Sequence, residues 1–428
     1  MAEISLTDES VLTDEFLRQL INVGEVDILV GVPTYNNAKT IGSIVETIQA
    51  GILKYFPRQR AAIINADGGS RDGTPELVES AAIDDVRRSS TLSTLRTLHS
   101  ISTRYGNSPA RGTALRTILA AAELLRAKAC AVISPDSTQL TTEALTSLLG
   151  PIYRGENCDL TLPIYSRHRF DGILLNNLLA PMTRALYGLQ IREPFAVEFA
   201  FSGRLGSQFL AQNAWHDETA CDGSEMLFSL AAIAGEFRIC QTFLGNKEHS
   251  QWRSADLVPA LRQTVGALFS SLEPNFALWS SKTGSQSITT TGAEQQQVLE
   301  PLRVNRKRLR DMFSTGVAEL HSVFQSILTP STLTELQQIA RPEEGSASYS
   351  AELWVKTIYE FAAAYHKSVI SRDHIIQALA PLFRGRALTF ITENSNRSAA
   401  DVDANIEALC LEFERMKPYL LEIWNGGK

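Results

Sequence analysis

VDILVGVPTYNN, residues 26–37, is an apolar run rich in β-branched side chains that passes into a polar loop. Residues 37–56 then carry apolar side chains at helical spacing, and RAAIINADGGS at 60–70 repeats the apolar run with a polar end. A third run, CAVISPD at 130–136, follows a long helical pattern at 110–129. This alternation of strand and helix predicts an α/β fold, Rossmann-like, with a mainly parallel sheet and helices on both faces.

Outward from these strands the chain divides into three parts. Residues 1–25 are predicted to contain an N-terminal helix that Thr13 or Asp14 caps. Residues 26–254 hold the predicted strands and are expected to form one domain. From 255 to 428, successive segments carry apolar stripes with a period of 3.6 residues. They predict an α-helical C-terminal region. The same apolar stripes can pack against a second copy of the chain, which leaves a homodimer open.

Composition restricts the classes of protein that the chain can belong to. Its 428 residues include 40 basic and 47 acidic side chains, which gives a formal charge of −7. An acidic globular chain lacks the basic surface that nucleic acid or an anionic membrane requires, so neither partner is expected. No signal-peptide pattern and no apolar run of about 18 residues is present. The five cysteines form no CxxC pair, so we expect a cytoplasmic protein without disulfides or a zinc site.

Polar residues gather where the three predicted strands end. They are Pro33-Thr34-Tyr35-Asn36-Asn37, the run 65–74 with Asp67-Gly68-Gly69 at its start, and Ser134-Pro135-Asp136-Ser137. Ligands of open α/β sheets bind beyond these carboxyl ends. Two carboxylates there, Asp67 and Asp136, suit a nucleoside and a divalent cation that takes carboxylate and phosphate oxygens. Taken alone, the Asp-Gly-Gly run is more typical of a tight turn, and the GxGxxG and P-loop spacings are absent.

Several motifs together resemble the GT-A glycosyltransferases. VPTYNNAKTIGSIVETI, NADGGSRDGTPELV, RGTALRTIL and the strand ending in SPD resemble the nucleotide half of family 2. IYSRHRFDGILLNNLLAPMTRALYGLQIREP and LGNKEH resemble the family 81 branch of glucosyl-3-phosphoglycerate and glucosylglycerate synthases. The resemblance covers about residues 26–250. It implies a GT-A fold and transfer of a hexose from a UDP- or GDP-linked donor to a small, glycerate-like acceptor. Family 81 implies retention of the anomeric configuration, whereas family 2 implies inversion.

The resemblance also assigns residues to the donor. It implies that Pro33, Tyr35 and Asn37 line the nucleobase and that Asp67 accepts from the base or the ribose. Arg111, in the motif Arg-Gly-x-Ala-Leu, is implied to bind the nucleotide or its diphosphate. Arginine stands there where the family has lysine, which keeps the charge but changes the geometry at a phosphate.

Two residues are implied to hold Mg²⁺ or Mn²⁺ at the diphosphate, where a cation neutralises the departing group. Asp136 is the last carboxylate of an Asp-x-Asp motif, and His249 matches the family's metal-binding histidine. Ser134 replaces the first aspartate of that motif, which removes one charged ligand. The alternative for Asp136 is an N-cap of the helix that starts near Thr141, and the alternative for His249 is a solvated loop position.

Acceptor binding and proton transfer complete the implied site. Glu225, with Arg111, is the candidate catalytic residue, and Asp222 competes with Glu225 for the role of base or acceptor contact. A carboxylate near a helix N-terminus is the alternative for Glu225. The candidate acceptor residues also include Arg167, Asp171, Asn176 and Glu198.

Two further readings remain open. Ile173 and Leu175 stand where the branch often has threonine, and Ser134 weakens the metal motif. These departures motivate a catalytically weak or inactive homologue that binds a nucleotide or sugar, or that assists assembly. A nucleotidyltransferase shares the sheet but lacks its Gly-rich first loop here, so it ranks last.

Overall fold

The computed structural model describes residues 12–80, 98–104, 111–212, 223–247, 257–293, 304–341 and 348–426. The chain forms two compact units, and neither is a single continuous segment. The first unit contains Met1–Tyr165, Ala196–Gly245 and Thr289–Glu294, and the second contains Ser166–Phe195, Asn246–Ile288 and Gln295–Lys428.

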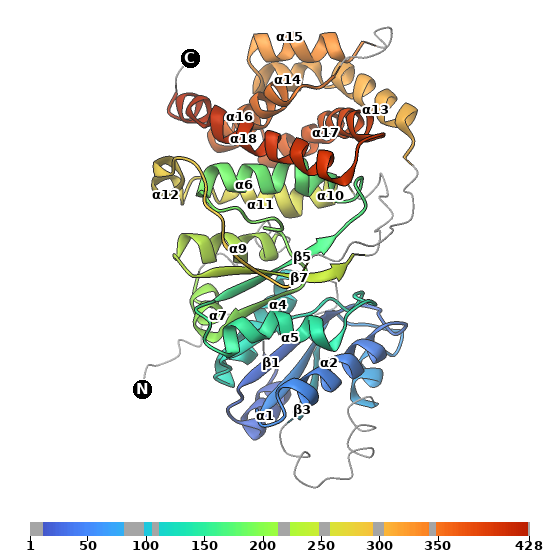
Figure 1. The fold of residues 1–428 in the computed structure, drawn as a ribbon, viewed down its shortest axis with the longest axis vertical. Coiled ribbons are helices and arrows are strands. Elements are labelled where there is room, and N and C mark those ends of the chain that lie inside the picture. The colour runs from blue at the N-terminus through green and yellow to red at the C-terminus, as the bar shows by residue number, and fades with distance from the viewer. Residues whose placement is uncertain are drawn as a thin grey trace. The chain divides into compact units, whose positions relative to one another are not determined.

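The first unit is built on an eight-stranded sheet with the order β3-β2-β1-β4-β6-β5-β7-β8 (Figure 1). The strands are β1 (Ile28–Thr34), β2 (Ala61–Asp67), β3 (Leu98–Arg104), β4 (Ala129–Val132), β5 (Leu160–Ser166), β6 (Phe199–Ser202), β7 (Ile239–Asn246) and β8 (Thr289–Thr291). β1 is parallel to β2 and β4, and β2 is parallel to β3. β6 runs antiparallel to both β4 and β5. The predicted α/β fold with a mainly parallel sheet is confirmed.

Helices cover both faces of this sheet because successive side chains of a strand point to opposite faces. Ile28, Val30 and Val32 of β1 belong to a buried core that includes residues of α2 (Ile41–Tyr55) and α5 (Thr142–Tyr153). Figure 1 shows these two helices side by side over one face. Gly31 points the other way, against Ile118 of α4 (Arg111–Leu124). The absence of a side chain at Gly31 lets α4 approach the strand closely.

The helix predicted at the N-terminus is α1 (Asp14–Val23). Thr13 caps it, because its Oγ1 accepts a hydrogen bond from the backbone N–H of Phe16 at 3.3 Å. Phe16, Leu20 and Val23 form its buried face. The sequence therefore predicted both the helix and one of its two candidate caps correctly.

Strand register brings the polar loops to one edge of the sheet. Thr34 at the end of β1 is aligned with Asp67 at the end of β2. On the other side of β1, Gly31 is aligned with Val132 of β4, so residues 133–137 leave the sheet beside the β1 loop. Two helices of this unit also start near the edge: α4 at Arg111 and α9 (Ser224–Ala234) at Ser224. A further helix, α7 (Gly203–Leu210), packs against α4 and α9.

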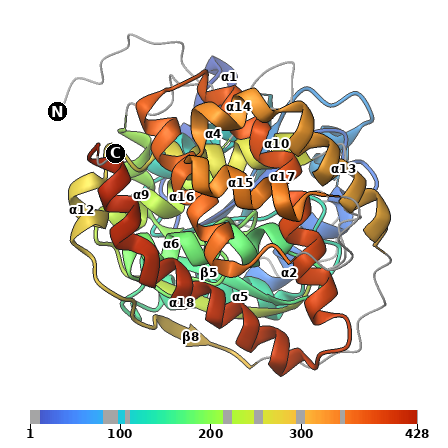
Figure 2. The ribbon, with the colours of Figure 1, turned by 90° about the horizontal axis from the view of Figure 1, so that it is seen from above.

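The second unit is helical, as the periodicity of the C-terminal half predicted (Figure 2). Its first part is η1 (Leu175–Leu179), α6 (Ala180–Tyr187), α10 (Leu257–Leu261), η4 (Arg262–Gly266), α11 (Ala267–Ser270) and α12 (Phe276–Ser281). The rest is α13 (Arg306–Glu319), α14 (His321–Ile327), α15 (Pro330–Ile339), α16 (Ala351–Lys367), α17 (Arg372–Asn394) and α18 (Ala399–Trp424). Over the described residues, no helix has the length and apolarity that crossing a bilayer requires.

Buried charges tie α6 to α18 within this unit. The Arg184 guanidinium of α6 donates to the carboxylates of Glu407 and Glu414, with Nη1 and Nε each 2.6 Å from an oxygen. Nearby, the Lys417 ammonium donates to the backbone carbonyls of Leu186 and Lys282 at 3.0 and 2.7 Å. Burial makes such pairs costly to break, so they hold α6 firmly against α18.

Candidate functional site

The loops that follow β1 and β2 are joined by hydrogen bonds between backbone and side chain. Asn36 has a positive φ of 54°, and its N–H donates to Ser70 Oγ at 2.8 Å. The N–H of Asn37 donates to Thr74 Oγ1 at 2.9 Å. Hydrogen bonds to Asp72 from the Thr74 hydroxyl and from backbone N–H groups hold the pKa of that carboxyl below its usual value. This network gives the edge of the sheet a defined shape.

Asp67 is buried at the centre of these two loops. Its Oδ1 accepts from the hydroxyls of Thr34 and Ser70 at 2.9 and 2.5 Å. Its Oδ2 accepts from the backbone N–H groups of Gly69 and Ser70 at 2.9 and 2.8 Å. Two carboxylate oxygens offer about four lone-pair sites. These contacts occupy them with the tight turn that the Asp-Gly-Gly run also suggested.

Asn37 and Asp136 lie together at the edge. Asn37 Nδ2 donates to Asp136 Oδ1 at 2.9 Å, and Asn37 Oδ1 accepts from the N–H of Tyr35 at 2.8 Å. Tyr35 is 40% exposed, which is high for a large aromatic side chain. Three of the residues assigned to the donor, together with Pro33 of β1, therefore share one end of the sheet.

The described residues supply a sparse set of metal ligands. Asp136 is exposed, and its backbone N–H donates to the hydroxyl of the buried Ser134 at 3.3 Å. No group of three His, Cys, Asp or Glu residues that could hold an ion occurs in the described part of the chain. His249 lies outside the described residues. One carboxylate is compatible with a cation that takes its remaining ligands from phosphates and water, but it is not a metal site by itself.

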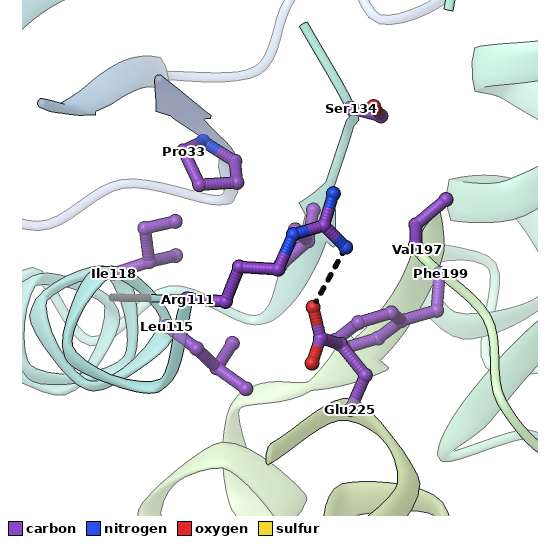
Figure 3. A pocket seen from close by; sticks show the side chains of 9 residues that line it. Pro33, Arg111, Leu115, Ile118, Ser134, Val197, Phe199 and Glu225 are labelled. Atoms are coloured by element: carbon purple, nitrogen blue, oxygen red, sulfur yellow. Dashed lines mark hydrogen bonds and ion pairs between the residues drawn. The ribbon is translucent and has the colours of Figure 1, made fainter. Parts of the chain in front are cut away.

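A small hollow of about 10 Å³, room for roughly one water molecule, lies beside these loops and is partly open to solvent (Figure 3). We call it the Arg111 hollow, and it is lined by Pro33, Arg111, Leu115, Ile118, Val132, Ser134, Val197, Phe199 and Glu225. Arg111 Nη1 lies 3.2 Å from Glu225 Oε1, and the two side chains are 43% and 9% exposed. Figure 3 shows the guanidinium between Pro33 and Glu225. The two residues predicted to be catalytic are thus in contact.

Secondary structure explains this contact. Arg111 belongs to α4, and Glu225 is in the first turn of α9, just after its N-cap Gly223. Helix N-termini carry a partial positive charge and free N–H groups, which favour anions nearby. Ser224 Oγ donates to the second oxygen of Glu225 at 3.1 Å. The Glu225 carboxylate therefore has a cation on one oxygen and a hydroxyl on the other.

Glu198 is buried beside the loop that follows β4. Its Oε2 accepts from the Tyr165 hydroxyl at 2.7 Å, and its Oε1 accepts a short hydrogen bond from the Ser137 hydroxyl. Ser137 follows Asp136 directly. Glu198, assigned to the acceptor from sequence, thus connects the loop that carries Asp136 to the end of β5 and the start of β6.

The remaining acceptor candidates lie mostly in the second unit. Arg167 donates to both carboxylate oxygens of Glu193, and its Nη1 lies 3.7 Å from Asp171 Oδ2. Asn176 is half-buried in η1. Asp222 is outside the described residues. In this unit the structure brings Arg167 and Asp171 together and adds Glu193 to them.

Sequence reasoning assigned no individual role to several polar residues that shape the site. Tyr165 and Ser137 position Glu198, while Ser70 and Asn36 connect the first two loops. Each follows or ends a predicted strand, so their position along the chain was informative. Their partners were not predictable, because those lie at separations of 33 to 61 positions that obey no periodic pattern.

Among known proteins, the chain shows similarity to solved structures alone. No family model and no curated protein matches the chain. Glucosyl-3-phosphoglycerate synthase from Mycobacterium tuberculosis, in complex with phosphoglyceric acid, is 21% identical over 61% of this chain and 85% of its own, with a TM-score of 0.42. The same enzyme with Mn²⁺, UDP-glucose and phosphoglyceric acid is 20% identical over 62% and 85%, with a TM-score of 0.41. These structures come from the branch that the motifs resemble. With TM-scores below 0.5, no functional argument rests on them.

Proposed function

We propose that the chain is a glycosyltransferase that moves a hexose from a nucleoside diphosphate sugar to a small hydroxylated, glycerate-like acceptor. The observation that carries the proposal is the contact between Arg111 and Glu225 in a hollow at the carboxyl edge of a mainly parallel sheet. Ligands of such sheets bind at this edge. A cation there can stabilise a departing diphosphate, and a carboxylate there can accept a proton.

The donor would bind over the β1 loop. The exposed ring of Tyr35 offers a face for a nucleobase, and Pro33 and Asn37 lie next to it along the chain. Asp67 would support ribose or base binding indirectly, because its hydrogen bonds fix the turn that follows β2. We keep both UDP and GDP as candidate nucleotides, since these side chains fit either base.

Arg111 would stabilise the charge that develops on the departing diphosphate, which is the main way in which a preorganised cation lowers such a barrier. The bond between the anomeric carbon and the phosphate oxygen breaks, and a bond to the acceptor oxygen forms. Glu225, or Asp222, would take the proton of the acceptor hydroxyl. Retention is our proposed stereochemical outcome, and the anomer of the product tests it.

A divalent cation is part of the proposal. Asp136, with His249, would hold Mg²⁺ or Mn²⁺ together with the donor's phosphates, and the ion would neutralise charge on the leaving group. Asp136 is already oriented by Asn37. The acceptor residues are proposed to be Arg167, Asp171, Asn176, Glu198 and Asp222.

Ser134 supports one alternative, a homologue that binds a nucleotide or sugar with little or no catalysis. Its hydroxyl accepts from the N–H of Asp136, so it fills the position of a charged ligand without supplying charge. Such a protein would bind nucleotide without a strong dependence on metal.

The test combines binding and turnover. Thermal shift and calorimetry with UDP, GDP and ADP, each with and without Mn²⁺, identify the nucleotide, because a ligand of the folded state raises the melting temperature. Turnover is then measured with the matching hexose donors and with glycerate and phosphoglycerate as acceptors. The test variant is Arg111→Met, and the control is Arg126→Met, which removes an exposed arginine. Transfer that Arg111→Met abolishes supports the proposal. Binding without transfer favours the alternative, and absence of binding contradicts both.

A further inference from the structure

The ion pair in the Arg111 hollow has an unusual asymmetry. The Arg111 guanidinium is 43% exposed and open to the hollow, while the Glu225 carboxylate is 9% exposed and contacts it at 3.2 Å. A buried carboxylate needs its partners, because an uncompensated buried charge is costly. An exposed guanidinium can exchange partners with little loss. Arg111 can therefore leave this pair at low cost, whereas Glu225 would then be a buried charge without its cation.

The surroundings of the Glu225 carboxylate favour an anion at that place. Glu225 lies in the first turn of α9, whose N-cap is Gly223, and Arg111 belongs to α4. Glycine has no side chain that could cap the N–H groups of α9, and those groups favour negative charge. In addition, the first two turns of α4 line the hollow through Leu115 and Ile118. One cation and the N-terminus of α9 thus meet at one hollow, and a carboxylate of the chain itself lies there.

We propose that Glu225 holds, in the ligand-free chain, the place beside Arg111 that a phosphate of the donor takes. This inference rests on the proposed function. A nucleoside diphosphate and Glu225 then compete for the same guanidinium. Binding exchanges one charge-assisted interaction for another, so the donor binds less tightly than the hollow would allow without Glu225.

The exchange has a consequence for the order of events. While Arg111 faces Glu225, the guanidinium compensates the charge of the buried carboxylate. Once a phosphate takes over Arg111, Glu225 keeps the Ser224 hydroxyl on its second oxygen and loses its cation. Glu225 therefore loses its cation only when the donor is bound, and the cost of leaving this buried charge uncompensated falls on donor binding.

Calorimetry with UDP and GDP on four forms of the full chain tests this inference: wild type, Glu225→Gln, Arg111→Met and the double variant. Glutamine keeps the shape and the hydrogen-bonding oxygen of Glu225 but removes its charge. We expect Glu225→Gln to bind the diphosphate roughly three- to tenfold more tightly, since a charge-assisted hydrogen bond no longer competes. We also expect the gain to vanish in the double variant and to shrink in high salt.

Glu123→Gln is the matched control, because Glu123 is exposed on α4, the helix of Arg111, and loses the same charge. It should leave the affinity unchanged, and melting temperatures establish that each variant is folded. If the diphosphate binds in an Arg111-dependent way and Glu225→Gln binds it equally or less tightly, the inference is wrong and the proposed function stands. If neither wild type nor Glu225→Gln binds UDP or GDP, the proposed function fails as well.

Discussion

Asn37 and Asp136 are 99 positions apart in the chain, and a hydrogen bond of 2.9 Å joins Asn37 Nδ2 to Asp136 Oδ1. The same amide accepts from the N–H of Tyr35 through Oδ1. One side chain therefore sets the position of an exposed carboxylate and of the loop that carries an exposed aromatic ring. It couples the end of β1 to the residues that follow β4.

Asn37→Ala removes both hydrogen bonds. The Asp136 carboxylate then samples more orientations, and each lost hydrogen bond is worth about 0.5–1.5 kcal/mol. We expect UDP or GDP, whichever the wild type binds, to bind about three- to tenfold more weakly with Mn²⁺ present. Thr47→Ala removes an exposed side-chain hydrogen bond of α2 and serves as the control. Equal affinity of Asn37→Ala and wild type, measured by calorimetry, would show that Asp136 needs no such support.

Tyr165→Phe tests whether Glu198 acts through the β4 loop. The change leaves the buried carboxylate with one partner fewer, so the unfolding free energy should fall by about 1–3 kcal/mol in a urea titration. Nucleotide affinity should fall with it, because Ser137 and Asp136 are adjacent. Tyr153→Phe, on α5, is the control. A rise in the acceptor KM with unchanged nucleotide affinity would instead place Glu198 at the acceptor.

Gly31→Ala should destabilise the first unit. A Cβ there would lie 2.7 and 2.8 Å from the Cδ1 and Cγ1 atoms of Ile118, and overpacking of a core costs about 1–3 kcal/mol. Ile118→Ala added to Gly31→Ala should restore part of the loss. Gly42→Ala is the opposite control: its Cβ meets nothing within 4 Å in α2, and it should stabilise by about 0.5–1 kcal/mol. Urea unfolding measures these three variants and the wild type; a neutral Gly31→Ala would contradict the close approach of α4.

Lys417 predicts a pH dependence of stability. Burial lowers its pKa to about 8, with nearby Lys282 acting in the same direction and Glu414 opposing. Between about pH 8 and 10.5 the unfolded chain holds a proton that the folded chain has lost, so the unfolding free energy rises with pH in this window. The rise that Lys417 contributes is at most about 3 kcal/mol. Below about pH 8, Lys417 is protonated in both the folded and the unfolded chain, so the destabilisation that its buried charge causes has its full value there.

Urea unfolding of wild type and Lys417→Met at pH 7.5 and 10 measures this contribution. Methionine has no titrating group. From pH 7.5 to pH 10 the unfolding free energy of the wild type should therefore rise relative to that of Lys417→Met. Other groups titrate equally in both proteins and cancel. A constant difference would mean that Lys417 stays protonated throughout.

Three of the strands that the sequence predicted correctly have buried faces on both sides. β1, β2 and β4 are continuous apolar runs because helices cover them on both sides. β3, LHSISTR, is only partly buried and is largely polar, so no pattern distinguishes it from a loop. β6 has only four residues, Phe199–Ser202. Apolar periodicity reports burial, and it loses information wherever a strand is short or half-exposed.

The site was predictable up to the level of its strand ends. Since parallel strands end at one edge, the sequence placed Asn37 and Asp136 on a common edge, and the resemblance pointed to Arg111 and Glu225. It could not indicate that the two pair with each other, because their contact depends on where α4 and α9 begin in space. Nor could it indicate that residues 166–195 join the helical unit, because that depends on packing between segments far apart in the chain.

β8 ends the sheet, and its three threonines come from a stretch between helices, well after the other strands in the chain. It pairs in parallel with residues 240–242 of β7. An uncovered strand edge is a template on which other chains add, and a very short polar edge strand is one protection against that. A shortened chain that stops before residue 289 would leave β7 bare, so such a fragment is expected to self-associate into aggregates even if the other seven strands form.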